Sequence, residues 1–309
     1  MEPISFQPIY MTRVWGGRTL EDNYQRNLPD EQPYGESWEL SDREHEQSVV
    51  LSGIHEDRTL NELWTKNREE IFGSNLDGDR FPLLIKILDA RDDLSIQVHP
   101  PAEIAPHLGG DPKTEMWYIA DRDPEAKLYI GFKNGVSRDQ FANSLEDGTV
   151  EDKVHAVQPE IGESIFIPSG RLHAIGAGFL IYEIQQNSDT TYRVFDWNRV
   201  GLDGIPRDLH VEESMKSIDF DDFEPTMDEP QGDNLAQCEY FQVDQKDLEK
   251  GASFSNGRER FAVITVVSGL IISSEGSQFR PGDFFLLPKG ASPISADRES
   301  KILVTTIPV

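Results

Sequence analysis

Apolar residues along this chain occur mostly in short runs that end at glycines, prolines or acidic residues. Runs of this length, some continuous and some alternating with polar positions, are typical of β-strands. The predicted strands are 81–88, 94–99, 127–132, 163–167, 179–185 and 261–267. Helical spacing is rarer and covers 59–72, 137–145 and 211–218, the second with Ser137 as its N-cap. The pattern therefore predicts a mainly β protein with a few short helices, arranged as a sandwich or as barrels.

An acidic, proline-bearing segment separates two strand-rich regions. Residues 219–234, DFDDFEPTMDEPQGDN, are poor in aliphatic side chains and are typical of a linker. A similar turn–strand–turn pattern stands on each side of it, GESIFIPSG from Gly162 and GDFFLLPKG from Gly282, 120 residues apart. Two copies of one β unit explain this most simply, and a chance match of one hairpin is the alternative. We expect a larger domain over 1–225 and a smaller one over 235–309.

Charge and cysteine content narrow the class of protein. The 309 residues include 56 acidic and 29 basic side chains, for a formal net charge of −27. Such a charge argues against binding to nucleic acid or to anionic membranes, and an anionic substrate would need a local cluster of bases. A single cysteine, Cys238, excludes an internal disulfide and multi-cysteine metal sites. We expect a cytoplasmic protein with no nucleic-acid or membrane partner.

Candidate chemistry rests on histidines and carboxylates, because the sequence has no P-loop, dinucleotide-binding fingerprint or nucleophile-elbow motif. In residues 95–100, SIQVHP, Gln97 and His99 lie two apart on a predicted strand, so their side chains share a face. Glu115 begins another apolar stretch, and His173 follows the first repeated turn. Two imidazoles, a carboxylate and an amide oxygen meeting inside a barrel suit Zn²⁺ or another divalent first-row ion, with one position open.

Each of these residues also has an ordinary structural explanation. A single histidine on a strand is more often a core or surface residue than a ligand, and Glu115 could end a strand in solvent. The other histidines lie among charged residues or near prolines, and we expect them in solvent: His45, His55, His107, His155 and His210. Spacing alone therefore predicts a metal-binding β-barrel and leaves its reaction open.

Longer blocks of sequence are similar to one known family. They are VWGG at 14–17, GESWE at 35–39, FPLLIKILDA at 81–90, LSIQVHP at 94–100, KTEMWY at 113–118, IPSGRLHAIG at 167–176 and EIQQNSDTTYRVFDW at 183–197. In this order, from about Pro8 to Arg199, the blocks resemble the short bacterial form of type I mannose-6-phosphate isomerase, a zinc-dependent cupin enzyme. The C-terminal third of the chain shows no further block of this kind and contributes only the second copy of the turn–strand–turn pattern.

The resemblance implies a fold, a reaction and a cofactor. The fold would be two cupin-type (jelly-roll) β-barrels with a few short helices. The reaction would interconvert mannose 6-phosphate and fructose 6-phosphate through a cis-enediol. One Zn²⁺ per chain would be bound by the family's ligand positions, which fall on Gln97, His99, Glu115 and His173. The smaller domain is expected to bind no metal, since Pro293 stands at the repeat position of His173.

The resemblance also implies roles for residues around the metal. Its phosphate-binding positions are matched by Arg193, with Lys113 and Arg199 as companions, and Arg193 and Lys113 are also expected to act in catalysis. The general base would be Glu183 or Asp189. Without a catalytic role, Glu183 would be an acid at the end of a strand and Asp189 an acid in a turn. Trp15 would form the floor of the pocket or belong to the core, and Arg171 would touch substrate or pair with a surface acid.

Two other classes of protein remain as alternatives. A metal-dependent cupin dioxygenase would prefer iron and need no phosphate site, so the basic residues count against it. A non-catalytic sugar-phosphate-binding cupin could lose its metal ligands, so the intact set of four counts against it. The sequence is compatible with a monomer or a homodimer.

Overall fold

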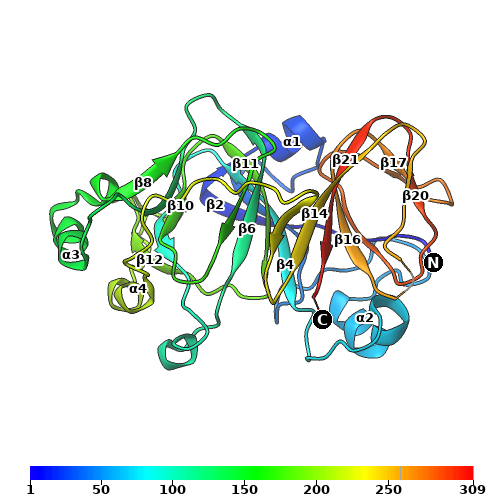
Figure 1. Cartoon of the computed structure of the whole chain (residues 1–309), viewed down its shortest axis with the longest axis horizontal. Coiled ribbons are helices and arrows are strands. Elements are labelled where there is room, and N and C mark those ends of the chain that lie inside the picture. Colours follow the sequence, from blue (N-terminus) through cyan, green and yellow to red (C-terminus); the bar gives the residue numbers. More distant parts are fainter. Residues whose placement is uncertain (258, 309) are drawn as a thin grey trace. The chain divides into compact units, whose positions relative to one another are not determined.

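The computed structural model describes residues 1–257 and 259–308, and the chain divides into two compact units (Figure 1). The terminal unit contains Met1–Ile9, Trp38–Ile85 and Glu229–Val309, and the central unit contains Tyr10–Ser37 and Lys86–Asp228. Both are built from strands and a few short helices, so the predicted mainly β fold is confirmed. Every residue singled out above for chemistry lies in the central unit.

Two sheets make up the central unit. The first has five strands in the order β12-β5-β10-β7-β8: β5 (Ile96–Val98), β7 (Leu128–Phe132), β8 (Val154–Val157), β10 (His173–Ile175) and β12 (Tyr192–Phe195). The second, drawn mostly from this unit, has six in the order β2-β3-β4-β11-β6-β9: β2 (Ile9–Gly17), β3 (Tyr34–Leu40), β4 (Leu83–Ala90), β6 (Glu115–Arg122), β9 (Ser164–Ile167) and β11 (Phe179–Gln186).

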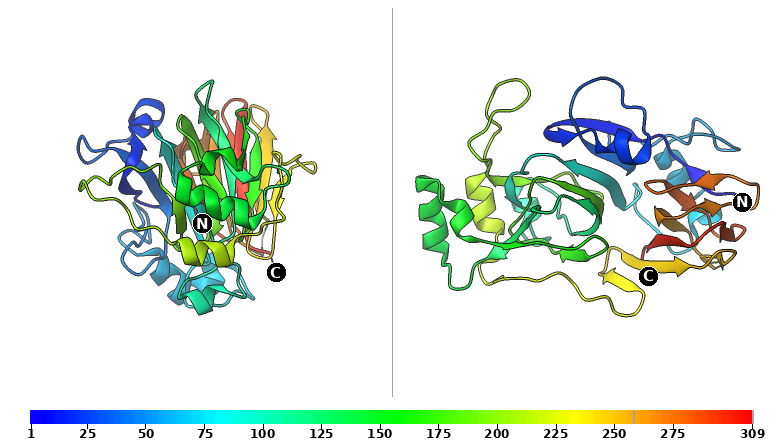
Figure 2. Two further views of the ribbon diagram at one scale, coloured as in Figure 1. Left: turned by 90° about the vertical axis from the view of Figure 1, so that its left-hand side faces the viewer. Right: turned by 90° about the horizontal axis from the view of Figure 1, so that it is seen from above.

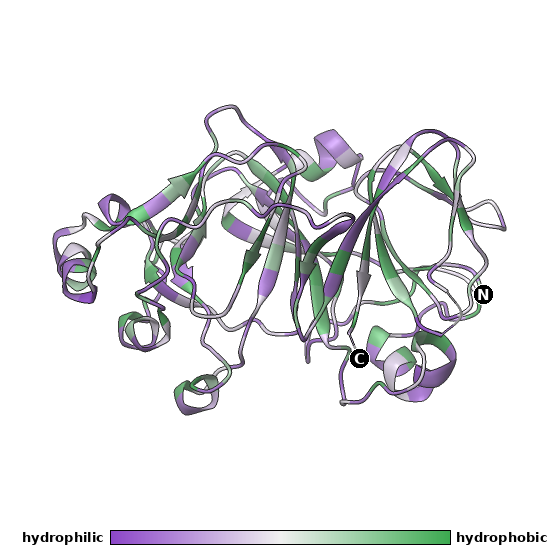
Figure 3. Ribbon diagram, in the orientation of Figure 1, coloured by the Kyte–Doolittle hydropathy of each residue, from purple (hydrophilic) through white to green (hydrophobic). Residues whose placement is uncertain are grey.

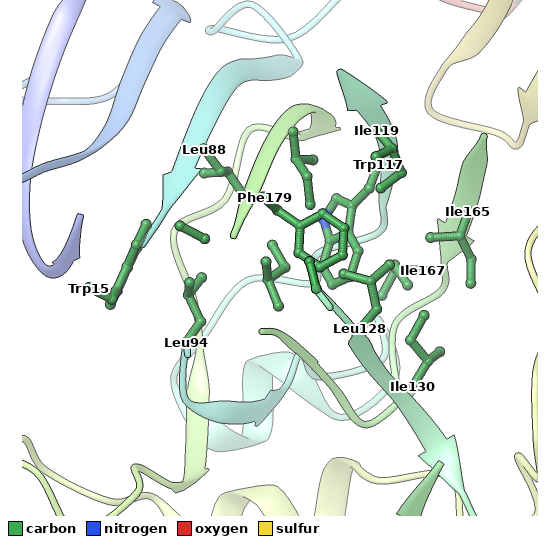
Figure 4. Close-up of a cluster of buried hydrophobic side chains, with 14 residues drawn as sticks. Trp15, Leu88, Leu94, Trp117, Ile119, Leu128, Ile130, Ile165, Ile167 and Phe179 are labelled. Carbon is green, nitrogen blue, oxygen red and sulfur yellow. The ribbon is translucent and has the colours of Figure 1, made fainter. Parts of the chain in front are cut away.

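The main core of the central unit lies between these two sheets. Leu128 and Ile130 of β7 join Trp117 and Ile119 of β6 in one buried cluster, whose members are almost fully excluded from solvent. Figure 4 shows Trp15 at one side of this cluster, away from the end formed by β9. A strand whose other face is covered as well, such as β7, in which every residue is buried, is a continuous apolar run in the sequence.

The other face of the five-stranded sheet is covered by helices. Ile96 and Val98 of β5 pack there with Phe141 of α3 (Arg138–Asp147) and Met215 of α4 (Val211–Ser217). The two helices lie together at one end of the central unit (Figures 1 and 2). Since Ile96 and Val98 face the helices, the residue between them faces the other sheet.

Helix boundaries follow the sequence at two of the three predicted places. Ser137 caps α3 through a capping box with Gln140, and α4 ends one residue before its predicted end. The predicted helix 59–72 is interrupted, because α2 (Leu60–Lys66) gives way to a wider π-helical turn, η1 (Arg68–Phe72). The remaining short helices are α1 (Thr19–Tyr24), η2 (Ala105–Leu108) and η3 (Val150–Asp152).

The terminal unit also has two sheets around one core. A six-stranded sheet has the order β1-β19-β16-β21-β14-β13: β1 (Ile4–Ser5), β13 (Asn234–Gln237), β14 (Gln242–Leu248), β16 (Ala262–Ser268), β19 (Phe284–Leu287) and β21 (Ser300–Thr306). A four-stranded sheet has the order β15-β20-β17-β18: β15 (Ser253–Phe254), β17 (Ile271–Ile272), β18 (Gln278–Phe279) and β20 (Ile294–Ala296). Residues of both sheets form its buried cluster, and hydrophobic positions concentrate in the strands (Figure 3).

Two further features bear on the predictions from sequence. Within residues 1–257 and 259–308, no sheet closes on itself, so closed barrels are not seen. Residues 219–228 of the segment predicted as a linker are held along the central unit, because Phe223 pairs with Phe132 and Asp228 accepts a hydrogen bond from the Phe166 N–H. In the described part of the chain, no helix is both long and apolar enough to cross a membrane.

Candidate metal centre and active site

Three buried side chains converge between the sheets of the central unit. His99 follows β5, while Glu115 and His173 are the first residues of β6 and β10. The Nε2 atom of His99 lies 3.4 Å from Oε2 of Glu115, and Nε2 of His173 lies 3.6 Å from Oε1. All three side chains are fully excluded from solvent. Among the residues that the structure describes, this is the one such cluster of His, Cys, Asp or Glu ligand atoms.

Backbone carbonyl groups fix the orientation of both imidazoles. Nδ1–H of His99 donates to the carbonyl oxygen of Thr190 at 2.9 Å, and Nδ1–H of His173 donates to that of Arg171 at 2.9 Å. Burial lowers the pKa of His173 to about 3, and burial together with the Lys113 ammonium lowers the pKa of His99. Both rings are therefore neutral and direct an Nε2 lone pair toward the carboxylate, as metal-binding histidines do.

The carboxylate of Glu115 is held in its charged form. Burial alone would raise its pKa, but the Lys113 ammonium, whose Nζ lies 2.8 Å from Oε2, lowers it well below the usual value. Glu115 Oε1 and His99 Nε2 are buried without a hydrogen-bond partner. Buried acceptors without partners are costly, so this arrangement favours a cation between them.

The donor set fits a divalent metal ion. Ligand atoms placed tetrahedrally about 2.0–2.2 Å from Zn²⁺ lie roughly 3.3–3.6 Å apart, which matches the spacing of the two imidazoles from the carboxylate. Gln97 stands directly across from His173 in the sheet, and its amide nitrogen donates to His173 Nε2 at 3.3 Å. A half-turn of that amide would present its oxygen at the same place. His99, Glu115 and His173, with Gln97, could therefore hold the ion.

A cavity of about 380 Å³ adjoins this group. One wall is apolar and belongs to the core cluster of Figure 4, with Trp15, Leu88 and Leu94 at the cavity. His99 and Glu115 are not among the lining residues and lie behind its wall. Residues predicted from sequence that line it are Trp15, Gln97, Lys113, His173, Glu183, Asp189 and Arg193. The volume is that of a small-molecule site.

An ionic network runs along the wall formed by the six-stranded sheet. Arg13 Nε donates to Glu36 Oε1 at 2.7 Å, and Lys86 Nζ lies 3.6 Å from Glu36 Oε2. The same ammonium lies 3.3 Å from Oε1 of Glu183, whose Oε2 accepts a hydrogen bond from Trp117 Nε1 at 3.0 Å. Burial and the charge of Glu115 raise the pKa of Glu183, although the two lysines oppose this. A buried carboxyl with a raised pKa can exchange protons near neutral pH.

The predicted basic residues differ in how their charges are paired. Arg171 donates to both oxygens of Asp222 at 2.9 and 3.1 Å, and Arg199 donates to Asp196 and Asp92. Neither of these two arginines lines the cavity. Arg193 does, and no carboxylate pairs with it among the residues described by the structure. Its Nη1 donates to a backbone carbonyl, while Nε is buried without a partner.

Several cavity residues were missed by the sequence analysis: Arg13, Glu36, Lys86, Arg207 and His210. Lys86 could have been found, because a lysine inside a fully buried strand must have a charged partner. His210, expected in solvent, lines the cavity, and His55 is buried in the terminal unit. His45 and His107 are exposed as expected, and His155 is half-buried.

A close backbone approach positions Trp15 and Arg13 at the cavity. A Cβ atom on Gly35 would lie 2.6 Å from Cζ3 of Trp15 and 2.6 Å from Cβ of Arg13. Gly35→Ala is therefore expected to displace both side chains and to cost about 1–3 kcal/mol of stability through overpacking. Urea unfolding measures the stability, and the difference in tryptophan emission between variant and wild type reports the displacement of Trp15, one of five tryptophans. An unchanged unfolding midpoint and spectrum would contradict this account of the glycine.

Fold and site together define a mainly β protein with a buried metal-binding group beside a small-molecule cavity. A family model described as phosphomannose isomerase type I, catalytic domain, matches residues 4–131. Mannose-6-phosphate isomerase ManA of Bacillus subtilis is 36% identical over 316 residues, with 98% of each chain covered. The chain belongs to the type I phosphomannose isomerase family.

Solved structures agree with this assignment. A crystal structure of mannose 6-phosphate isomerase from Bacillus subtilis has a TM-score of 0.89 at 31% identity and covers 99% of this chain and 100% of its own. A structure described as mannose 6-phosphate isomerase bound with zinc and yttrium has a TM-score of 0.76 at 16% identity, with 99% and 100% covered. At that identity the second structure shows a shared fold.

Proposed function

We propose that this protein interconverts mannose 6-phosphate and fructose 6-phosphate. The observation that carries the proposal is the cross-strand row His173–Gln97–Arg193 on β10, β5 and β12, because its two ends, a proposed metal ligand and a guanidinium without a carboxylate partner among the described residues, line one cavity. Neighbouring strands lie about 4.8 Å apart, so the two ends of this row are separated by roughly 10 Å. A hexose phosphate carries its reacting carbons and its phosphate at opposite ends and suits such a site. The relatives named as mannose-6-phosphate isomerases support the same reaction.

For the cofactor we propose one zinc ion per chain, held by His99, Glu115, His173 and Gln97. Imidazole and carboxylate donors suit zinc, and a protein of this fold is described as binding zinc. When bound, the ion would act as a Lewis acid toward the oxygens on the first two carbons of the open-chain sugar. The terminal unit would bind no metal.

The chain's own residues would perform the proton transfers and position the sugar. Moving a proton between C2 and C1 through a cis-enediol needs one group that accepts and returns it. Glu183 is the better of the two candidates, because it is buried beside Lys86 and has a raised pKa, whereas Asp189 is exposed at the cavity edge. Lys113 would keep Glu115 ionised, and Trp15 would exclude water from one face of the sugar.

Capture of the substrate has to overcome the charge of the protein. A net charge of −27 repels a dianionic phosphate at long range, so binding must rest on short contacts in the cavity. Arg193 suits this role because its charge is not neutralised by a carboxylate among the described residues. The substrate-binding roles predicted for Arg171 and Arg199 stay predictions.

We also propose a fold type, a cellular location and an oligomeric state for the protein. Two sheets facing each other around one core are the arrangement of a double-sheet jelly roll, so each unit is proposed to be of the cupin type. The larger domain over 1–225 would be catalytic, and 235–309 would be the smaller cupin-like domain. We propose a cytoplasmic enzyme that works as a monomer or a homodimer.

A coupled assay tests the reaction directly. Fructose 6-phosphate formed from mannose 6-phosphate is converted further and followed by NADPH absorbance, with unphosphorylated mannose as the comparison substrate. We expect turnover of the phosphorylated sugar and a much lower kcat/KM for mannose. Absence of turnover by metal-loaded protein would refute the proposed reaction and favour a non-catalytic sugar-phosphate-binding protein.

Arg193→Ala is expected to lower kcat/KM for mannose 6-phosphate by about ten- to a hundredfold, because a charge-assisted contact to phosphate is worth about 1.5–3 kcal/mol. Metal content should be unchanged, since the guanidinium does not contact the ligands. Arg138→Ala, an exposed arginine on α3, is the matched control and should retain full activity. Wild-type kcat/KM in the Arg193 variant would place the phosphate elsewhere.

A further inference from the structure

The segment between β12 and α4 (Figure 1) brings two side chains to the cavity that have no part in the metal centre. Arg207 and His210 both line the cavity beside Arg193. Arg193 is tied to this segment, because its Nη1 donates to the carbonyl oxygen of Asp208 at 2.9 Å and its own carbonyl accepts the His210 N–H at 2.7 Å. One corner of the cavity therefore gathers two guanidinium groups and an imidazole.

Asp196 fixes the orientation of Arg207. The Nε and Nη2 groups of Arg207 donate to the two carboxylate oxygens of Asp196, at 2.8 and 2.5 Å. Although burial raises the pKa of Asp196, Arg207 and Arg199 lower it below the usual value, so the carboxylate stays charged. This two-point contact sets the plane of the guanidinium and leaves its Nη1 edge outside the pairing.

Among the described residues, the guanidinium groups of this corner form an ion pair with one carboxylate, that of Asp196, through Arg207. Asp196 is shared between Arg207 and Arg199, and Arg193 has no carboxylate partner in the described ranges. Burial and the positive charge of Arg207, which lines the same cavity, lower the pKa of Arg193, although Asp196 and Asp208 oppose this. An anion bound between the two guanidinium groups would offset the repulsion between their charges.

The imidazole of His210 has a defined tautomer. Its Nδ1 accepts a hydrogen bond from the backbone N–H of Arg193 at 3.3 Å, so a neutral ring carries its proton on Nε2. An Nε2–H group in the cavity lining is a further donor for an anion. The lining has three acidic residues: Glu36 and Glu183 are paired within the network of Arg13 and Lys86, and Asp189 is exposed to solvent.

We propose that Arg207 and His210 complete a phosphate site with Arg193 and determine the preference for phosphorylated over unphosphorylated sugar. This inference rests on the proposed function, because it assigns the phosphate end of the same substrate. Arg207 supplies a second charged contact from the Nη1 edge that Asp196 leaves available, and His210 supplies a further donor through Nε2–H. Asp196 is a positioning residue for Arg207.

The test uses the zinc-loaded holoenzyme and inorganic phosphate as the probe, with binding measured by calorimetry and by inhibition of turnover. Arg207→Gln is expected to weaken phosphate binding and to lower kcat/KM for mannose 6-phosphate about ten- to a hundredfold, with kcat/KM for mannose unchanged. His210→Gln removes one hydrogen-bond donor and should lower phosphate affinity and kcat/KM for mannose 6-phosphate about two- to tenfold. Arg207→Lys keeps the charge without the fork and should fall between the wild type and Arg207→Gln.

Arg122→Gln is the matched control, since this arginine pairs with Glu160 on the same unit and does not line the cavity. It should bind phosphate as the wild type does. Circular dichroism and metal content confirm that each variant is folded and loaded. Unchanged phosphate affinity in folded Arg207→Gln would overturn the inference. Arg199 also pairs with Asp196 but does not line the cavity, so a loss of phosphate affinity seen in Arg199→Gln and not in Arg207→Gln would overturn it too. If the wild type binds phosphate through Arg207 but does not turn over mannose 6-phosphate, the proposed function fails while the anion site stands.

Discussion

His173→Ala is expected to abolish turnover and to remove most of the bound metal. The side chain is fully buried, its Nε2 faces Oε1 of Glu115 at 3.6 Å, and its other nitrogen is held by a backbone carbonyl. A metal acting as a Lewis acid lowers the activation barrier by several kcal/mol, so loss of the metal should lower kcat/KM by at least about a thousandfold. Metal content by mass spectrometry and the coupled assay measure the two effects on the same samples.

His107→Ala provides the control for that variant. His107 is an exposed histidine of the same unit, on η2, and its loss should leave both metal and activity intact. Because removing a buried ring can also destabilise the fold, His173→Leu keeps much of the side-chain volume without offering a ligand atom and serves as the second variant. Stoichiometric metal and full activity in either His173 variant would exclude this residue as a ligand.

Glu183→Gln is expected to lower kcat about a hundred- to ten-thousandfold, the usual contribution of a general base. The substitution keeps the volume and the acceptor for Trp117 Nε1, so substrate and metal binding should change little. Steady-state kinetics separates kcat from KM, and deuterium at C2 of the substrate reports proton abstraction.

Asp189→Asn is the comparison for Glu183. Asp189 is exposed and lines the same cavity, so it offers a carboxylate without burial. A small decrease in kcat for Asp189→Asn, together with a large decrease for Glu183→Gln, supports Glu183 as the general base. The opposite result would transfer the proton-transfer role to Asp189.

Individual helices and strands could be predicted from the sequence because residues close together in the chain determine where they begin and end. Ser137 and Gln140 form the capping box expected for α3. The strand predicted at 81–88 starts only at Leu83, because Pro82 has no N–H to contribute to a ladder. The order of strands within each sheet could not be read in the same way. It depends on contacts between residues far apart in sequence, such as the pairing of His173 with Gln97.

The site was predictable where it lies on regular strands and unpredictable where it depends on loops. Gln97 faces the cavity because Ile96 and Val98 alternate with it, as the pattern requires. The ionic partners of Arg199 could not be deduced, since the chain offers 56 acidic residues and only folding selects Asp196 and Asp92. Arg207 and His210 follow the last block of family resemblance, on a segment without hydrophobic periodicity.

The proposed isomerisation of a sugar phosphate in this cavity requires a single metal ion at His99, Glu115 and His173. The most direct test of this requirement is to strip the protein with a chelator, add back Zn²⁺ in known amounts, and follow conversion of mannose 6-phosphate to fructose 6-phosphate. We predict no turnover by the stripped protein and a linear rise to full activity at one zinc per chain. Full turnover by metal-free protein, or no turnover at any zinc level, would contradict the account.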